Sequence, residues 1–113
     1  MYIIGQGLWG KLKFVDNTMP EYKRPYLVVA VNSNSKMLTV LNVSSVRGKE
    51  PKLLFPYNLE LKKYNPPFIE RSFVKLDSAV EITFKQAGEC KLLCGGKILD
   101  SSELKTILTA YIQ

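Results

Sequence analysis

Residues 23–45, KRPYLVVAVNSNSKMLTVLNVSS, decide the fold of this chain. Two runs rich in valine, leucine and other strand-forming residues, 26–31 and 37–43, flank the polar segment 32–36. This arrangement predicts an antiparallel hairpin of two strands. Neither run alternates cleanly between apolar and polar residues, so we expect both faces of the hairpin to be buried. The same pairing would place Arg24, at one end, beside Ser44 and Ser45 at the other.

Composition limits the possible chemistry. The 113 residues predict one domain, 1–113, and the 46% apolar content is ordinary for a globular protein. The chain has neither a long apolar run nor a recognisable signal peptide, so we expect a cytoplasmic protein without a membrane span. The absence of histidine removes the commonest general base and metal ligand. Cys90 and Cys94 do not complete a zinc site, and we expect reduced thiols, no metal and no cofactor.

The remaining segments predict further strands and one helix. We expect strands over 8–15, 53–55 and 57–63, and a long strand over 73–84 that bends near Ser78. Residues 64–68 contain two prolines and predict a surface crossing. Asp100 is the expected N-cap of a helix over 101–112, with Glu103 completing a capping box. Its apolar stripe predicts a helix packed on the sheet, and comprises Leu104, Ile107, Leu108 and Tyr111.

These elements predict a mainly β fold with α: a small, antiparallel, SH3-like or otherwise partly closed barrel with a C-terminal helix. The net charge of +6 is compatible with a nucleic-acid partner but equally with a solvated lysine surface. Trp9 is expected in the core or in a dimer contact rather than as a platform for base stacking.

Four motifs, in this order, resemble the MazF/PemK (Kid-like) toxins of bacterial toxin–antitoxin modules. The first motif is a glycine with a first strand, Gly10 to Phe14, then a loop and Arg24-Pro25 before an apolar strand. The second is the next strand, which ends in Ser44. Residues 72–77 match the pattern Ser-x-Val-Lys/Arg-x-Asp, and residues 99–104 match a helix start of the type Leu-Asp/Ser-x-x-Glu-Leu. The resemblance covers most of the chain.

The resemblance implies the toxin of a type II toxin–antitoxin system, a metal-independent, sequence-specific endoribonuclease. In this family the ribose 2′-hydroxyl of single-stranded RNA attacks the adjacent phosphorus and leaves 2′,3′-cyclic phosphate and 5′-hydroxyl ends. Arg24 matches the catalytic arginine and Ser44 the Thr/Ser that ends the second strand. Asp77 and Lys75 match an acid and a basic residue that some members use. A homodimer and a cognate antitoxin, whose tail folds over the RNA groove, are also implied.

The residue chemistry suits these roles. A planar guanidinium at Arg24 fits phosphate oxygens bidentately, and Asp77 could act as base if burial raised its pKa. Ser44 and Ser45 could bind a phosphate oxygen or orient Arg24. Single-stranded RNA also needs stacking surfaces and cations, and the adjoining loops offer Tyr22, Lys23, Tyr26, Arg47, Lys49 and Lys52.

Two other functions stay open on the sequence. The gyrase poison CcdB has the same general fold, so the chain could be a non-catalytic barrel that binds a protein. The basic charge alone would also fit a passive nucleic-acid-binding module. Arg24, Ser44 and Asp77 need to converge only if the chain is a nuclease.

Overall fold

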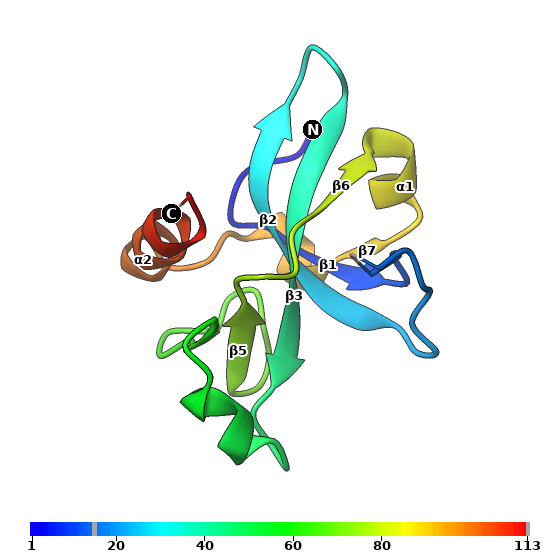
Figure 1. Cartoon of the computed structure of the whole chain (residues 1–113). Coiled ribbons are helices and arrows are strands. Elements are labelled where there is room, and N and C mark those ends of the chain that lie inside the picture. The colour runs from blue at the N-terminus through cyan, green and yellow to red at the C-terminus, as the bar shows by residue number, and fades with distance from the viewer. Residues whose placement is uncertain (15, 113) are drawn as a thin grey trace.

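The central hairpin is present as predicted. The computed structural model describes residues 1–14 and 16–112. Strands β2 (Arg24–Asn32) and β3 (Met37–Ser45) pair antiparallel, with Tyr26 opposite Asn42 and Asn32 opposite Met37. Figure 1 shows the hairpin as the long axis of the molecule. The polar segment between the strands forms its turn, where the Asn32 side chain accepts hydrogen bonds from Asn34 N and Ser35 N.

The other edge of β3 carries two short strands in place of the predicted long one. Strand β6 (Val80–Thr83) pairs with the first half of β3, and β5 (Ser72–Lys75) pairs with its end (Figure 1). Between them, the Ser78 hydroxyl accepts a hydrogen bond from Asn42 N at 2.8 Å and donates one to the Lys75 carbonyl at 2.6 Å. The bend expected near Ser78 is therefore a full interruption, because a side chain replaces the ladder bond there.

The rest of the sheet extends from both sides of this pair. Strand β1 (Gly7–Gly10) lies beside β2, β7 (Lys91–Leu92) beside β1, and β4 (Asn58–Glu60) beside β5. The sheet has seven strands, all paired antiparallel. The first strand is shorter than the predicted 8–15, whose last residue, Val15, lies outside the described residues. It ends at Gly10 because its partner strand β2 begins at Arg24, the residue opposite Gly10.

Two other predictions were wrong. Residues 53–55 are not a strand: Glu50–Leu54 form a 3₁₀ helix, η1, with Pro51 in its first turn, where a missing N–H does no harm. The predicted long strand also included Phe84, which is the first residue of helix α1 (Phe84–Gly88), directly after β6. The Thr83 side chain caps this helix by accepting from Gln86 N at 3.0 Å. A second 3₁₀ helix, η2, spans Leu93–Gly96.

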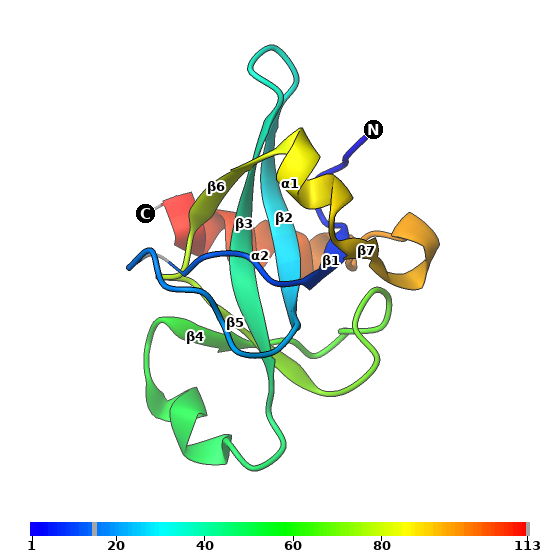
Figure 2. The ribbon, with the colours of Figure 1, turned by 90° about the vertical axis from the view of Figure 1, so that its right-hand side faces the viewer.

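Both faces of the hairpin are buried, as the lack of alternation predicted. One face, with Leu27 and Leu41, packs against α2 (Ser101–Ile112), whose Ile107 is fully buried. The other face, with Val28 and Val40, packs against β1, β6 and α1. Figure 2 shows α2 behind the hairpin and α1 in front of it. The result is a mostly antiparallel seven-stranded sheet with a C-terminal helix, with a radius of gyration of 12.9 Å.

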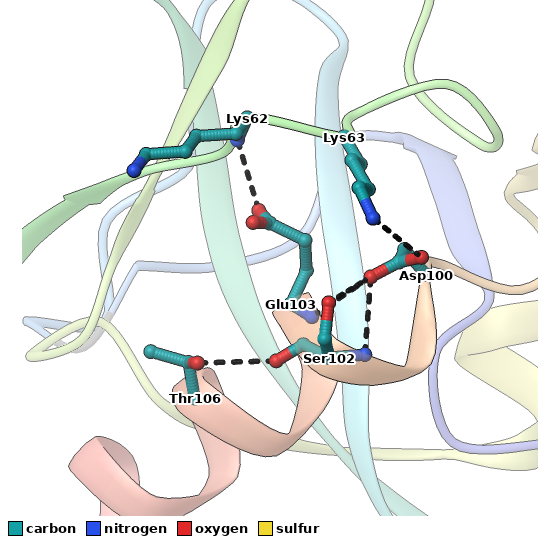
Figure 3. A network of polar contacts seen from close by, with 6 residues as sticks. All are labelled: Lys62, Lys63, Asp100, Ser102, Glu103 and Thr106. Atoms are coloured by element: carbon teal, nitrogen blue, oxygen red, sulfur yellow. Dashed lines mark hydrogen bonds and ion pairs between the residues drawn. The ribbon is translucent and has the colours of Figure 1, made fainter.

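The start of α2 confirms the predicted cap but corrects the capping box. The Asp100 carboxylate accepts hydrogen bonds from Ser102 N at 3.0 Å and Glu103 N at 3.1 Å (Figure 3). The Glu103 carboxylate, however, accepts from Lys62 N at 2.9 Å, in the segment after β4. Glu103 therefore ties the helix to the sheet. The predicted capping box is wrong because the Glu103 carboxylate bonds Lys62 N, a donor that is distant in the sequence.

Asp100 gives this end of the molecule an acid dependence. Hydrogen bonds from the Ser102 hydroxyl and the Glu103 N–H hold the pKa of its carboxyl below the ordinary value of 3.8. A lowered folded-state pKa stabilises the fold above the unfolded value, and that stabilisation is lost as pH falls through the folded one. The urea concentration at the midpoint of unfolding should thus decrease more between pH 6 and pH 3 in wild type than in Asp100→Asn. This variant keeps a capping oxygen without the charge. Equal drops would contradict this role.

None of the helices in residues 1–14 and 16–112 has both the length and the apolar composition needed to cross a membrane.

Candidate functional site

A groove of about 950 Å³ lies where β2 begins and β3 ends. It brings together five of the eleven predicted site residues, namely Lys23, Arg24, Ser44, Ser45 and Lys49. The predicted meeting of Arg24 with the two serines is confirmed at the level of a shared cavity.

Strand register explains why a cavity opens at this point. The ladder between β2 and β3 ends at the Tyr26–Asn42 pair. Beyond it, Arg24 pairs with Gly10 of β1, whereas Ser44 pairs with Phe73 of β5. The two strand ends follow different partners and separate, so their side chains line a groove rather than fill a core.

Arg24 forms no ion pair with any acidic side chain of the described residues. Its guanidinium carbon lies 5.5 Å from the centroid of the Phe14 ring, within the range of a cation–π contact. Its Nε is shielded from solvent and makes no hydrogen bond to any described residue. The ion pairs found among residues 1–14 and 16–112 join Lys63 to Asp100 and Arg71 to Glu60, and neither includes Arg24. A buried donor without a partner is uncommon in proteins, and it belongs to one of the residues that line the groove.

Ser44 and Lys49 form the second polar element. The Lys49 Nζ donates to the Ser44 Oγ at 2.8 Å, and Ser44 is only 5% exposed. The connecting loop folds back because Gly48 adopts a φ of +76°, which glycine accepts without strain, and because Lys49 N donates to the Val46 carbonyl at 2.8 Å. The ammonium is therefore positioned over the hydroxyl by its own loop.

Lys75 lies beside this cluster, although it does not line the groove. Burial lowers the pKa of its ammonium, and the positive charges of Lys52, Arg24 and Lys49 lower it further. Asp77 acts in the opposite direction but weakly. Lys75, on β5, thus contributes positive charge to the neighbourhood of Arg24.

The other predicted residues lie outside the groove. Asp77 is exposed, in the turn after β5, so the burial that its role as a base required is not present. Tyr22 is 71% exposed in the loop before β2, and Arg47 lines a second depression, which shares Glu70 with the groove. Tyr26 cannot stack on a base, because it is 2% exposed and its hydroxyl bonds the backbone of Leu12.

Sequence reasoning missed several residues that line the groove. Trp9 is 38% exposed and lines it, so of the two expected places, the core and a dimer contact, the core is wrong. Ile69, 85% exposed, adds apolar surface, and Glu70 and Glu89 add the carboxylates. Nothing local could have signalled the glutamates, because they come from the segment before β5 and from the end of α1.

Gly10 fixes the contact between β1 and the segment that forms the groove wall. A Cβ at this position would lie 2.6 Å from Cys90 Sγ and 3.2 Å from Cys90 Cβ. We expect Gly10→Ala to lower the free energy of unfolding by about 1–3 kcal/mol, the usual range for overpacking. Cys90→Ala in the same chain should restore part of the loss, since Sγ is the nearest atom. Urea unfolding of the four proteins measures this, and no coupling between the sites would contradict it.

Among the described residues, no group of three or more His, Cys, Asp or Glu side chains is arranged to hold a metal ion. Cys90 and Cys94 are free thiols. Arg24, Lys49 and the Ser44 hydroxyl are, by contrast, the groups that bind phosphate oxygens in proteins. Neither a protein-family model nor a curated protein matches this chain.

Proposed function

We propose that this protein is an endoribonuclease that cleaves single-stranded RNA without a metal, as the toxin of a type II toxin–antitoxin system. The observation that carries the proposal is the Arg24 guanidinium, held against Phe14 in a groove with an unpartnered Nε. The Lys49–Ser44 pair lines the same groove. A fixed, unpaired guanidinium next to an ammonium and a hydroxyl suits a dianionic phosphorane better than it suits a neutral ligand.

In this mechanism the 2′-oxygen attacks the adjacent phosphorus, a bond to phosphorus forms, and the bond to the 5′-oxygen breaks. Arg24 binds two equatorial oxygens of the phosphorane and stabilises their charge. The Ser44 hydroxyl donates to a phosphate oxygen and at the same time accepts a hydrogen bond from Lys49. The proton of the 2′-hydroxyl passes to a carboxylate, and the leaving 5′-oxygen takes a proton from Lys49.

The carboxylate is the part of the site that changes most from the sequence-based hypothesis. Asp77 lies outside the groove, whereas Glu70 and Glu89, which are exposed as Asp77 is, line the groove together with Arg24. We therefore assign the base to one of these glutamates. Lys75, surrounded by Lys52, Arg24 and Lys49, adds positive potential that attracts the RNA backbone.

The remaining features of the proposal follow the family resemblance. The sheet would be a small SH3-like barrel, and two copies would form a homodimer with RNA along a shared groove. A cognate antitoxin, with a disordered segment that folds on binding, would cover the same groove. The site of action would be the cytoplasm, where its RNA substrate is made.

The test is cleavage of a mixed pool of unstructured RNAs by the purified protein in excess EDTA, with sequencing of both new ends. We expect 2′,3′-cyclic phosphate and 5′-hydroxyl termini and a short shared sequence at the cut. Cleavage that leaves 5′-phosphates would overturn the mechanism. Binding with a steep salt dependence and no cleavage would instead identify a passive nucleic-acid-binding protein.

A further inference from the structure

An aromatic pair stands exposed beyond the groove, on the segment that joins η1 to β4. Phe55 and Tyr57 are 47% and 42% exposed, although such rings usually bury most of their surface. Their centroids are 5.5 Å apart and their planes differ by 3°, so they form a stacked pair. We call Lys52, Phe55 and Tyr57 the 52–57 patch. The fold does not need these rings, since neither belongs to a buried core cluster.

Backbone contacts attach the patch to β5, beside the groove cations. Asn58, the residue after Tyr57, pairs with Lys75, and Leu76 N donates to the Tyr57 carbonyl at 2.7 Å. The Lys52 carbonyl accepts from the Asn58 side chain at 2.9 Å and from Phe55 N at 3.2 Å. The patch is therefore held in a fixed position next to Lys75.

Positive charge is continuous between the groove and the patch. Lys75 lies near enough to Lys52, Arg24 and Lys49 for their positive charges to lower the pKa of its ammonium. None of these four cations is paired with a carboxylate in the described part of the chain. A strip of unpaired cations that leads to a flat aromatic pair matches a polyanion with planar groups. Single-stranded nucleic acid has that chemistry, because its phosphates meet cations while its bases stack on rings.

We propose that the 52–57 patch binds the RNA strand on one side of the scissile phosphate, with a base stacked on the Phe55–Tyr57 pair and backbone phosphates at Lys52 and Lys75. This assignment rests on the proposed function, because it places the scissile phosphate at Arg24. It extends the site from one nucleotide step to a longer single strand. Substrates too short to reach the patch would bind through the groove alone.

Binding of 2′-O-methyl RNA, which lacks the attacking hydroxyl, tests the patch without cleavage. Fluorescence anisotropy would compare a mixed-sequence octanucleotide with a dinucleotide. Phe55→Leu/Tyr57→Leu keeps apolar side chains but removes the rings, and should weaken octanucleotide binding about 5- to 100-fold, the range for loss of base stacking. Dinucleotide binding should not change. The matched control, Phe55→Tyr/Tyr57→Phe, keeps both rings and should bind like wild type.

Lys52→Ala provides a second readout. It should lower the slope of log Kd against log salt by about 0.7, the value for one phosphate contact on a single strand. Wild-type binding by the leucine variant, or no octanucleotide binding by wild type, would overturn the patch assignment. The proposed function fails separately: a protein that cleaves no RNA but loses octanucleotide binding in the leucine variant has the patch and not the nuclease activity.

Discussion

Arg24→Ala is expected to lower the rate of RNA cleavage about 100- to 1,000-fold or more, the usual effect of removing one group that stabilises transition-state charge. The side chain lines the groove, has no carboxylate partner among the described residues, and has an unpartnered Nε. Among the described residues that line this groove, Arg24 is the only arginine. Initial rates on a fluorescent, single-stranded RNA measure the effect.

Two further variants separate charge from geometry. Arg24→Lys keeps the positive charge but loses the planar fork, so it should recover only a small part of the rate. Arg71→Ala removes an exposed arginine that pairs with Glu60 and does not line the groove, and should cleave like wild type. Circular dichroism and thermal unfolding of Arg24→Ala must match wild type. Full activity in a folded Arg24→Ala would remove Arg24 from the mechanism.

Ile107→Ala should produce the largest loss of stability, about 2–5 kcal/mol of the free energy of unfolding. Ile107 is 0% exposed and joins α2 to the face of the hairpin that carries Leu27 and Leu41. Truncation leaves a cavity between helix and sheet, which the surrounding side chains fill only partly. Urea unfolding, followed by far-ultraviolet circular dichroism, measures the change.

Lys105→Ala is the matched control for this prediction, since Lys105 is exposed on the same helix. It should change the free energy of unfolding by no more than about 0.5 kcal/mol. A small effect of Ile107→Ala, similar to that of Lys105→Ala, would mean that α2 does not pack on the sheet as described.

Local patterns predicted the elements that depend on local chemistry. The hairpin follows from two strand-forming runs around an Asn/Ser turn, and the helix from Asp100 followed by apolar residues at helical spacing. Burial of both hairpin faces followed from the missing alternation. In each case the residues that decide the structure lie within one segment of the sequence.

Predictions that depended on a distant partner were the ones that failed. The strand over 8–15 stops at Gly10 because its partner strand begins only at Arg24. The long strand over 73–84 breaks because Ser78 bonds Asn42, which lies 36 residues earlier. Glu103 leaves its helix to bond Lys62. Sequence alone gives no sign of these partners.

The candidate site divides in the same way. Arg24, Ser44 and Ser45 come from the two ends of one hairpin, so the hairpin prediction already placed them together. Asp77 was expected through a strand that the structure breaks, and it lies in the resulting turn. The groove carboxylates, Glu70 and Glu89, come from segments whose approach depends on β5 and α1. The cationic half of the site was therefore predictable, and the acidic half was not.

The most direct test of the phosphate site is the proton resonance of the Arg24 Nε–H in protein labelled with ¹⁵N-arginine. The sequence holds three arginines, and Arg24→Lys identifies the signal. Arg71, whose Nε already donates to Glu60, serves as the internal reference. When 2′-O-methyl RNA is added, the Arg24 signal should move downfield in step with binding, while that of Arg71 stays in place. RNA that binds without moving the Arg24 signal would contradict the phosphate site at the centre of this account.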